Sequence, residues 1–588
     1  MKNSKSIVEE YLKKEDWRVN ENSNSPFSFG GLNKYITAEV SKDYWLRNVY
    51  TEDIAQAYVD GHIHLHDLGG LSLYCCGFSL REILLKGVRG VPNIPTSAPA
   101  KHFDSVLNQI ANLTTIYQNE IMGAVAFNSF DTLLAPFIKV DKLTYKEVKQ
   151  SMQNYVFSIN SNSRAGAEPA FSNVTFDLTP PKDLLDDYAI IGGEFVSFTY
   201  RSCQQEMDML NKAFFEVMLE GDSQGKLFAY PIPTYNIHER FDWDNPNNKL
   251  LWEMAGKYGT PYFANFLNSD LDISDVRSMC CRLRLDLTEL RHRNGGLFGA
   301  GDSTGSIGVV TINLPRIAYE SKGNRDEFFK KLDYYLNIAK ESLVIKRKWL
   351  KENIIDTNAV PAYMEYVGTL DNHFSTIGVI GMNEMCENFM GENIITNIGK
   401  KFALEVGSHV RDRLRLYQEE CGCLFNYEAT PAESTCYRLA LLDKKYCPDI
   451  ISQGSGKDCY YTNSCHIPVK YITGINDTFK HQEELQSQFT GGTVIHVYEE
   501  GAITGEQAKA IVKAMCTNYK VPYMSLSPIS RYCDEHGYIK DITDKCPICK
   551  KKLKLYQRIT GYLRPVDNFN RGKLAEFKDR KQIKANEM

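Results

Sequence analysis

The chain alternates between two patterns of apolar residues. Helical spacing marks residues 103–121 and 143–159, and it predicts a mostly helical segment over 103–225 and a helix over 324–355. Short apolar runs bounded by Gly, Pro or Asn predict strands. These runs occupy residues 71–78, 230–237, 259–266, 307–315, 378–384 and 422–431. Buried strands that lead into helices are typical of α/β proteins.

The start of the chain differs from this middle. Residues 1–25 are polar, and we expect a short lead-in without an apolar signal core. No apolar run approaches the length that crosses a bilayer. With 588 residues, 43% of them apolar, and a net charge of −5, the composition is that of a globular protein without a basic surface for polyanions. We therefore expect a cytoplasmic protein that does not bind a nucleic-acid polymer.

Sixteen cysteines in a chain without a predicted signal peptide favour free thiols, metal ligands or catalytic thiols over disulfides. The strongest local motif is Cys533-x-x-His536 followed by Cys546-x-x-Cys549, which has the spacing of a tetrahedral zinc site. Four protein ligands leave no position for a reacting water, so this zinc is predicted to be structural. A zinc ribbon that binds nucleic acid is the alternative, but it explains only this short segment.

Three histidines alternate along the chain just before the first predicted strand. His62, His64 and His66 would share one face of an extended segment. They could bind a metal side by side, or hydrogen bonds could hold them within a polar element. We favour the hydrogen bonds.

Two pairs of adjacent cysteines lie in different surroundings. Cys75 and Cys76 belong to the predicted strand 71–78, where neighbours point to opposite faces and a buried thiol is more often a packing residue than a reactive one. Cys280 and Cys281 precede a glycine-rich loop at residues 294–301, and adjacent cysteines do not suit an ordinary disulfide. This loop is not a P-loop, because neither Gly-Lys-Ser/Thr nor a helix start follows it.

A turn at residues 430–435, Thr-Pro-Ala-Glu-Ser-Thr, precedes a helical run. Free N–H groups at a helix start, with hydroxyl groups beside them, can bind an anion. A simple helix cap is the more frequent explanation on these residues alone. A second polar loop, Tyr-Thr-Asn-Ser-Cys-His-Ile-Pro, follows at residues 461–468.

Near the C-terminus, residues 558–563 read Arg-Ile-Thr-Gly-Tyr-Leu, and residues 569–573 read Phe-Asn-Arg-Gly-Lys. Gly561 lies in an apolar run without Pro, Asn or Asp, which predicts a strand-like segment rather than a turn. Removing a hydrogen from a glycine Cα leaves a planar radical delocalised over the flanking amides, and no side chain crowds that plane. Gly561 is therefore a candidate site for a stored backbone radical.

These C-terminal motifs resemble those of the anaerobic, glycyl-radical ribonucleotide reductases, also called class III. The turn at 430–435, the loop at 461–468 and the pair Cys281-Arg282 match further motifs of that family, and the resemblance spans roughly residues 27–581. It implies a ten-stranded α/β barrel of two parallel five-stranded half-sheets around a finger loop. It also implies a lead-in at 1–25 without an ATP-cone domain, a barrel with a helical dimer and effector region at 26–515, and a zinc-binding glycyl radical domain at 516–588.

The resemblance implies a role for each site residue. Gly561 would hold the radical, Cys281 would form the thiyl that removes the 3′ hydrogen of a ribonucleoside triphosphate, and Cys75 would donate hydrogen as water leaves C2′. The residues implied to bind substrate are Glu433, Ser434, Thr435, Ser464 and His466. The structural zinc ligands would be Cys533, His536, Cys546 and Cys549.

The resemblance also implies partners. These are a radical S-adenosylmethionine activase with an iron–sulfur cluster, dNTP or ATP as allosteric effectors, and a second copy of the chain in a homodimer. The reductant is formate or a thiol redox protein. Formate-using members carry Asn shortly before the Gly-Val-Val strand, and this chain has Ser306 or Ile307 there, so the reductant stays open.

A glycyl-radical acyltransferase of the pyruvate formate-lyase type is the alternative function. That family also has an adjacent Cys-Cys pair and a C-terminal glycyl motif. The zinc quartet and the turn at 430–435 favour the reductase.

Overall fold

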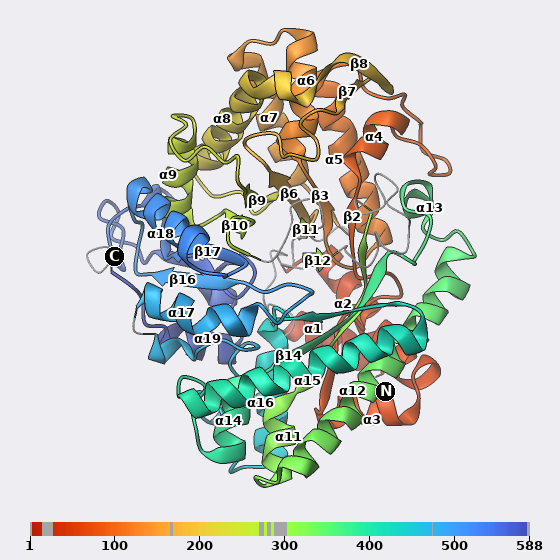
Figure 1. The fold of residues 1–588 in the computed structure, drawn as a ribbon, viewed down its shortest axis with the longest axis vertical. Coiled ribbons are helices and arrows are strands. Elements are labelled where there is room, and N and C mark those ends of the chain that lie inside the picture. Colours follow the sequence, from red (N-terminus) through yellow and green to blue (C-terminus); the bar gives the residue numbers. More distant parts are fainter. Residues whose placement is uncertain are drawn as a thin grey trace.

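The computed structural model describes residues 3–14, 27–164, 168–269, 276–278, 284–286, 303–472 and 474–584 (Figure 1). The predicted thiyl residue Cys281, its neighbour Cys280 and the glycine-rich loop at 294–301 lie outside these described residues. The short paired strands β11 (Val276–Ser278) and β12 (Arg284–Asp286) flank the Cys-Cys pair in the sequence.

Ten strands form the central barrel, as predicted. One half-sheet contains five parallel strands, in the order β2 (Cys75–Phe78), β3 (Val125–Phe127), β6 (Ser172–Phe176), β9 (Ile232–Ile237) and β10 (Tyr262–Asn265). The other contains β13 (Gly305–Asn313), β14 (His373–Ile380), β15 (Leu424–Glu428), β16 (Ile495–Glu499) and β17 (Tyr523–Pro528).

The two half-sheets close into a ring. β2 pairs antiparallel with β13, and β10 pairs antiparallel with β17. Within the second half-sheet a parallel bridge between Glu428 and Gly492 links the end of β15 to the residues that precede β16. A short outer strand, β1 (Ile63–Leu65), adds antiparallel to β13.

Helices cover the outside of the barrel because the outward strand residues are apolar. Phe176 of β6 packs against Phe214, with ring centroids 4.7 Å apart, and Val310 of β13 shares a core cluster with Leu336. The helices beside the first half-sheet are α4 (Leu80–Lys86), α5 (Phe103–Glu120), α6 (Phe130–Asp141), α7 (Tyr145–Ile159), α8 (Gln204–Glu220) and α9 (Asn248–Tyr258), and α4–α8 lie at the top of Figure 1.

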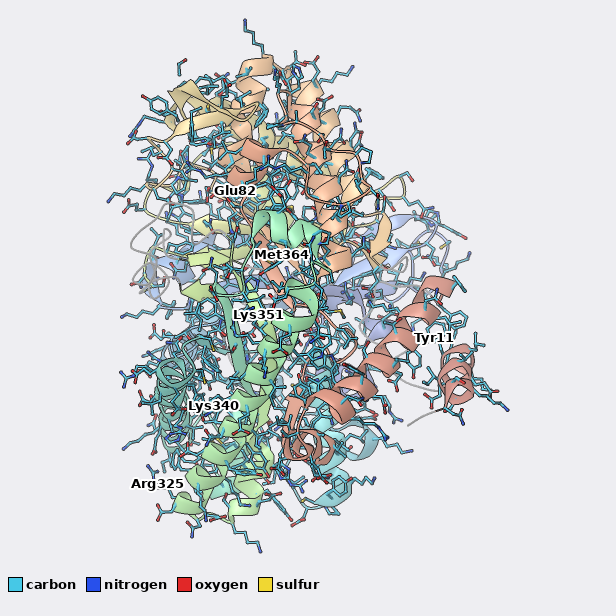
Figure 2. The ribbon with its side chains drawn as sticks, turned by 90° about the vertical axis from the view of Figure 1, so that its right-hand side faces the viewer. Tyr11, Glu82, Arg325, Lys340, Lys351 and Met364 are labelled. Carbon is cyan, nitrogen blue, oxygen red and sulfur yellow. The ribbon has the colours of Figure 1, made fainter. Side chains whose placement is uncertain are left out.

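The second half-sheet has its own helical layer. It contains α11 (Leu314–Ser321), α12 (Arg325–Leu350), α14 (Met382–Met390), α15 (Asn397–Cys421), α16 (Glu433–Tyr446), α17 (Ile475–Gln486) and α18 (Gly505–Asn518). Figure 2 shows α12 running along one face from Arg325 past Lys340, with Met364 of α13 (Pro361–Tyr366) above it. The remaining N-terminal helices are α1 (Ser4–Lys13), α2 (Phe29–Tyr44) and α3 (Glu52–Asp60).

A small four-stranded sheet follows the barrel. It contains β18 (Ser530–Cys533), β19 (Gly537–Ile539), β20 (Lys554–Arg558) and β21 (Leu563–Pro565), and helix α19 (Arg571–Asp579) comes after it. In Figure 1 these C-terminal elements lie at the left side of the barrel. Among the described residues, no helix is both long enough and apolar enough to cross a membrane.

The segment 103–225 is mostly helical, as predicted, because it contains α5, α6, α7 and α8. It also holds the barrel strands β3 and β6 and a ribbon of β7 (Tyr188–Ile191) and β8 (Glu194–Thr199), which were not predicted. β3 contains only Val125–Phe127, which is too short to show the period of a strand. The expected boundary after residue 515 lies too early, because barrel strand β17 comes after it.

Candidate active site

Gly561 is a turn glycine, contrary to the strand-like segment predicted for it. It lies in the four-residue loop between β20 and β21, where Arg558 pairs with Leu563 and the N–H of Ile559 donates to the carbonyl of Tyr562 over 2.9 Å. The loop is an apolar hairpin tip, which is why the sequence lacks the usual turn residues. Gly561 itself is buried.

Side chains from distant elements hold the main chain of Gly561. Its N–H donates to Oε1 of Glu433 over 3.0 Å. Its carbonyl accepts from the hydroxyl of Tyr262 and from Nη1 of Arg558, the latter over 3.3 Å. Tyr262 lies on barrel strand β10, and Glu433 is the first residue of α16, the helix that follows barrel strand β15.

Two arginines stabilise this loop through hydrogen bonds. The Arg558 guanidinium lies 4.0 Å from the centre of the Tyr262 ring and donates to the Tyr262 hydroxyl over 2.6 Å. Arg580 is fully buried and donates to the carbonyls of Arg558 and Ile559 over 2.8 and 2.7 Å. Both arginines thereby fix the backbone that leads into Gly561.

The second C-terminal motif has a packing role that the structure makes visible. Asn570 caps α19 by accepting from the Lys573 N–H over 2.8 Å, and its amide donates to the carbonyl of Glu433 over 3.2 Å. A Cβ on Gly572 would lie 2.8 Å from the Tyr437 ring of α16, so a larger residue does not fit. The motif therefore docks α19 on the helix that carries Glu433.

A buried ion triad completes this docking. Glu576 accepts from Nζ of Lys573 over 2.5 Å and from Arg580 over 2.9 Å. Burial acts to raise the pKa of Glu576, but the Lys573 ammonium and the Arg580 guanidinium outweigh it and lower that pKa. The carboxylate is therefore held in its charged form.

The predicted substrate residues gather at the start of α16 and in the loop at 461–468. Glu433 and Thr435 are buried in the first turn of α16, and Ser434 is half-buried beside them. Ser464 is buried with a left-handed φ of 43°, and its hydroxyl has no hydrogen-bond partner among the described residues. His466 is placed with Nδ1 2.7 Å from the Asn463 carbonyl oxygen and Nε2 2.7 Å from that of Val494.

A cavity extends from His466, the one predicted substrate residue in its lining, to the glycine loop. Its lining includes Asn463 and His466 from the predicted substrate loop, Thr560 next to Gly561, and the ion pair of Lys573 and Glu576. The Thr560 hydroxyl is buried and has no partner among the described residues. The two predicted parts of the site are thus adjacent in space.

The paired cysteines of β2 point to opposite faces, as the strand period requires. Cys76 lies on the outward face with Phe78, whose ring stacks on Tyr117 at 3.5 Å, and burial raises the pKa of the Cys76 thiol well above its usual value. Cys75 lies on the other face, where its sulfur accepts from the Ala124 N–H over 3.3 Å. Of the two thiols, Cys75 is thus the one on the face opposite to Phe78 and Tyr117.

The inward face of the barrel is polar. Three cross-strand contacts show this: Asn173 to Thr234 over 3.4 Å, Ser306 to Thr376 over 3.0 Å, and His496 to Ser525 over 2.8 Å. Buried polar groups in a dry interior need partners, so a lining of this kind suits a polar ligand better than an apolar one.

The zinc motif assembles as predicted. The ligand atoms of Cys533, His536, Cys546 and Cys549 all lie within 4.8 Å of one another. The Cys533 and Cys549 sulfurs are 3.5 Å apart, close to the separation of about 3.8 Å that a tetrahedral zinc imposes on two sulfurs. A hydrogen bond from the Glu535 N–H lowers the pKa of the Cys533 thiol to about 6, which favours the thiolate that binds metal.

The three histidines before β2 make hydrogen bonds instead of a metal site. His62 contacts Glu320 over 3.0 Å, and His66 contacts the Thr311 hydroxyl over 2.8 Å. His64 lies 3.2 Å from an Arg438 nitrogen, and burial together with His66 and Arg438 holds its pKa well below the usual value. The favoured interpretation of these histidines is confirmed.

Sequence reasoning missed several residues of the site. Tyr262 and Arg580 carried no local signal, because each contacts the glycine loop from a separate element. Arg558 and Asn570 were within the recognised motifs but had no assigned contact. The placement of Cys281 relative to Gly561 lies outside the described residues.

The sequence matches one family of known enzymes over most of its length. A model of the family "Anaerobic ribonucleoside-triphosphate reductase" matches residues 21–582. Proteins of that name from Haemophilus influenzae and Escherichia coli are each 25% identical to this chain, over 96% of it and 83% of the relative. The phage T4 protein is 24% identical, over 96% of both chains.

Solved structures show the same fold. The Thermotoga maritima anaerobic ribonucleotide reductase with dATP in the specificity site superposes with a TM-score of 0.75 at 23% identity, covering 95% of this chain and 94% of the other. Another anaerobic ribonucleotide reductase gives 0.78 at 22% identity, covering 98% and 92%. With a family match across almost the whole sequence, this chain belongs to the anaerobic ribonucleoside-triphosphate reductase family and is an oxidoreductase of deoxyribonucleotide synthesis rather than an acyltransferase.

Proposed function

We propose that this enzyme stores a glycyl radical at Gly561 and passes it to Cys281 to reduce ribonucleoside triphosphates. The observation that carries the proposal is the placement of Gly561, which is buried at a hairpin tip and held by Tyr262 of barrel strand β10 and Glu433 of helix α16. Burial keeps water and oxidants away from a reactive intermediate. An ordinary turn glycine has no need of such enclosure.

The proposed steps follow from the chemistry of the three residues. The Gly561 radical takes the hydrogen atom from the Cys281 thiol, and the resulting thiyl removes the 3′ hydrogen of the substrate ribose. Water leaves C2′ with help from Cys75 as proton and hydrogen donor. The reductant supplies two electrons, the 3′ hydrogen returns, and a deoxyribonucleoside triphosphate is released.

Substrate binding is proposed at the start of α16 and the adjacent loop. The free N–H groups of a helix start attract phosphate, and Ser434 and Thr435 add hydroxyl groups there. Ser464 and His466 would complete the pocket together with Glu433. Several buried polar atoms in this region lack a partner among the described residues, namely Asn426 Oδ1 and Nδ2, Thr430 Oγ1, Asn463 Nδ2 and Ser464 Oγ. Such atoms are favourable contacts for a polyphosphate or a sugar hydroxyl.

A zinc ion would be held by Cys533, His536, Cys546 and Cys549, whose arrangement fits a closed tetrahedral site. The metal would contribute stability and no reaction step. The ligands lie on both sides of β19 in the sequence and shortly before β20. A bound zinc ion would therefore restrict the movement of β20, the first strand of the hairpin that carries Gly561.

The partners are proposed on the family and on exposed surface. A radical S-adenosylmethionine activase would remove the Gly561 hydrogen, and formate or a thiol redox protein would serve as reductant. We also propose dNTP or ATP effectors and a homodimer. The relative from Thermotoga maritima has dATP in its specificity site, and the β7–β8 ribbon of this chain exposes Tyr188 and Phe195, at 57% and 60%, as a dimer surface would.

The direct test is anaerobic activation by a radical S-adenosylmethionine activase, followed by electron paramagnetic resonance. We expect a glycyl doublet in the wild-type protein and none in Gly561→Ala. A normal doublet in that variant would refute the assignment. Labelling with deuterated glycine should collapse the doublet.

A second experiment separates the two adjacent cysteines. Cys281→Ser should keep the glycyl doublet and lose nucleotide reduction, whereas Cys280→Ser should retain both. The reverse result would move the thiyl to Cys280.

A further inference from the structure

The hydrogen bonds to the Gly561 main chain have opposite electronic character on its two sides. On the amino side, a carboxylate oxygen of Glu433 accepts from the N–H over 3.0 Å. On the carbonyl side, the Tyr262 hydroxyl and the Arg558 guanidinium both donate to the oxygen. The Cα of Gly561 therefore lies between a negatively polarised amide and a positively polarised carbonyl.

This polarity matches the electronic needs of a Cα radical. Such a radical is stabilised when the amide nitrogen gives electron density and the carbonyl withdraws it. A carboxylate at the N–H strengthens the donor, because it draws the proton and leaves more density on nitrogen. Donors at the carbonyl oxygen strengthen the acceptor. Hydrogen-bonded groups in series polarise one another in this manner.

The surroundings keep these effects strong. Tyr262 is 1% exposed, Arg558 3% and Glu433 9%, so water does not screen the three groups. The Arg558 guanidinium is fixed in position by the hydrogen bonds that it donates to the Tyr262 hydroxyl and, over 2.8 Å, to the Thr260 carbonyl. Charge-assisted bonds at fixed positions need no reorganisation when the radical forms.

We propose that Glu433, Tyr262 and Arg558 stabilise the Gly561 radical by polarising its two amide groups in opposite directions. The three residues act through Gly561 as positioning residues. No bond to them forms or breaks. The hydrogen atom of the Gly561 Cα–H bond passes to the radical that the proposed activase supplies, and no other reactant is required. Glu433 thus acts on the radical store in addition to its proposed place beside the substrate.

The inference rests on the proposed radical function, and the test keeps the two apart. The protein is activated anaerobically as the full chain, and the α-proton splitting of the glycyl doublet is measured in wild type, Glu433→Gln and Tyr262→Phe. Gln keeps an oxygen that accepts from the N–H but removes the charge. Phe removes the hydroxyl but keeps the stack on Tyr523, at 5.2 Å, and the contact with Arg558.

Each variant has a matched control elsewhere in the molecule. Glu120, at the end of α5, is a half-buried glutamate that also accepts from the main chain, over 2.9 Å from the Ala362 N–H and 2.7 Å from the Tyr363 N–H, so Glu120→Gln makes the same substitution away from Gly561. Tyr363 is a buried tyrosine whose hydroxyl also donates to a main-chain carbonyl, that of Thr369 over 2.6 Å, so Tyr363→Phe is the control for Tyr262→Phe.

We expect Glu433→Gln and Tyr262→Phe to widen the doublet splitting, because spin density returns to Cα. We also expect them to lower the radical yield about tenfold, since hydrogen bonds with a charged partner contribute that much or more. Both controls should keep the wild-type splitting. Zinc content and thermal melting verify that each variant folds. If Glu433→Gln does not fold, the splitting measured in Tyr262→Phe tests the proposal by itself.

The outcomes are distinct. If Glu433→Gln and Tyr262→Phe both show the same doublet splitting as the wild-type protein, the inference is overturned and the radical function stays intact. No doublet in the activated wild-type protein would overturn the radical function itself. A change of equal size in the controls would also overturn the inference, because it would show a general effect of barrel packing.

Discussion

Arg580 is the residue whose loss should release the glycine hairpin most directly. Its guanidinium is fully buried and makes four hydrogen bonds, to Gln557 Oε1, to the carbonyls of Arg558 and Ile559, and to Glu576 Oε1, at 2.7–2.9 Å. Arg580→Ala would leave the Glu576 carboxylate with Lys573 alone and the hairpin carbonyls without a donor.

The expected magnitude follows from these contacts. Removing one partner of a buried ion pair destabilises by about 3–5 kcal/mol, because the remaining charge stays buried. We expect the loss to appear as local opening of β20–β21 and α19, since all four hydrogen bonds of Arg580 go to β20, to the loop after it and to α19. An opening that is easier by this amount is populated about 10² to 5 × 10³ times more often.

Hydrogen exchange of the full-length protein, kept anaerobic and zinc-loaded, measures this opening. Amides of residues 554–565 should lose protection in Arg580→Ala. Arg571→Ala is the matched control, because Arg571 also pairs with a carboxylate, that of Asp458 at 2.7 Å, but is 56% exposed, so solvent screens the pair and its loss should leave the hairpin protected. Equal protection of the hairpin amides in the two variants would refute the reasoning, and protection lost throughout the barrel would show that the effect is not local.

Three further predictions concern other parts of the molecule. Cys546→Ser should release zinc, measurable by metal analysis, and should lower the glycyl radical yield because the hairpin loses its support; unchanged zinc content would contradict the site. Cys75→Ala should abolish dNTP formation and Cys76→Ala should retain it, since only Cys75 lies on the inward face; equal activities would remove the distinction. Burial acts to raise the pKa of Glu320, but hydrogen bonds from His62 and Arg316 lower it to about 2, so Glu320 stabilises the fold above pH 4.5 and loses that effect as pH falls toward 2. In Glu320→Gln, the free energy of unfolding should fall by about 1–2 kcal/mol less than in the wild-type protein between pH 4.5 and pH 2, a value that allows for solvent screening. An unchanged pH dependence would contradict this prediction.

The residues that could be assigned from the sequence share one property, which is that their signal is local. The zinc ligands lie at short, regular spacing, and the assembled quartet is the one predicted. Helices α5 and α7 were found because their apolar spacing runs over several turns. The opposite orientations of Cys75 and Cys76 follow from the two-residue period of any strand.

Tertiary contacts decided the rest. Tyr262 and Gly561 are 299 residues apart and meet only because the barrel brings β10 beside the hairpin loop. The turn at Gly561 was missed for the same reason, since its stability comes from Glu433, Arg558 and Arg580 rather than from turn-forming residues nearby. Local propensity carries little information where buried hydrogen bonds from remote elements hold the backbone. The sequence alone therefore determined which glycine was a candidate for the radical, and the tertiary structure decided which side chains surround it.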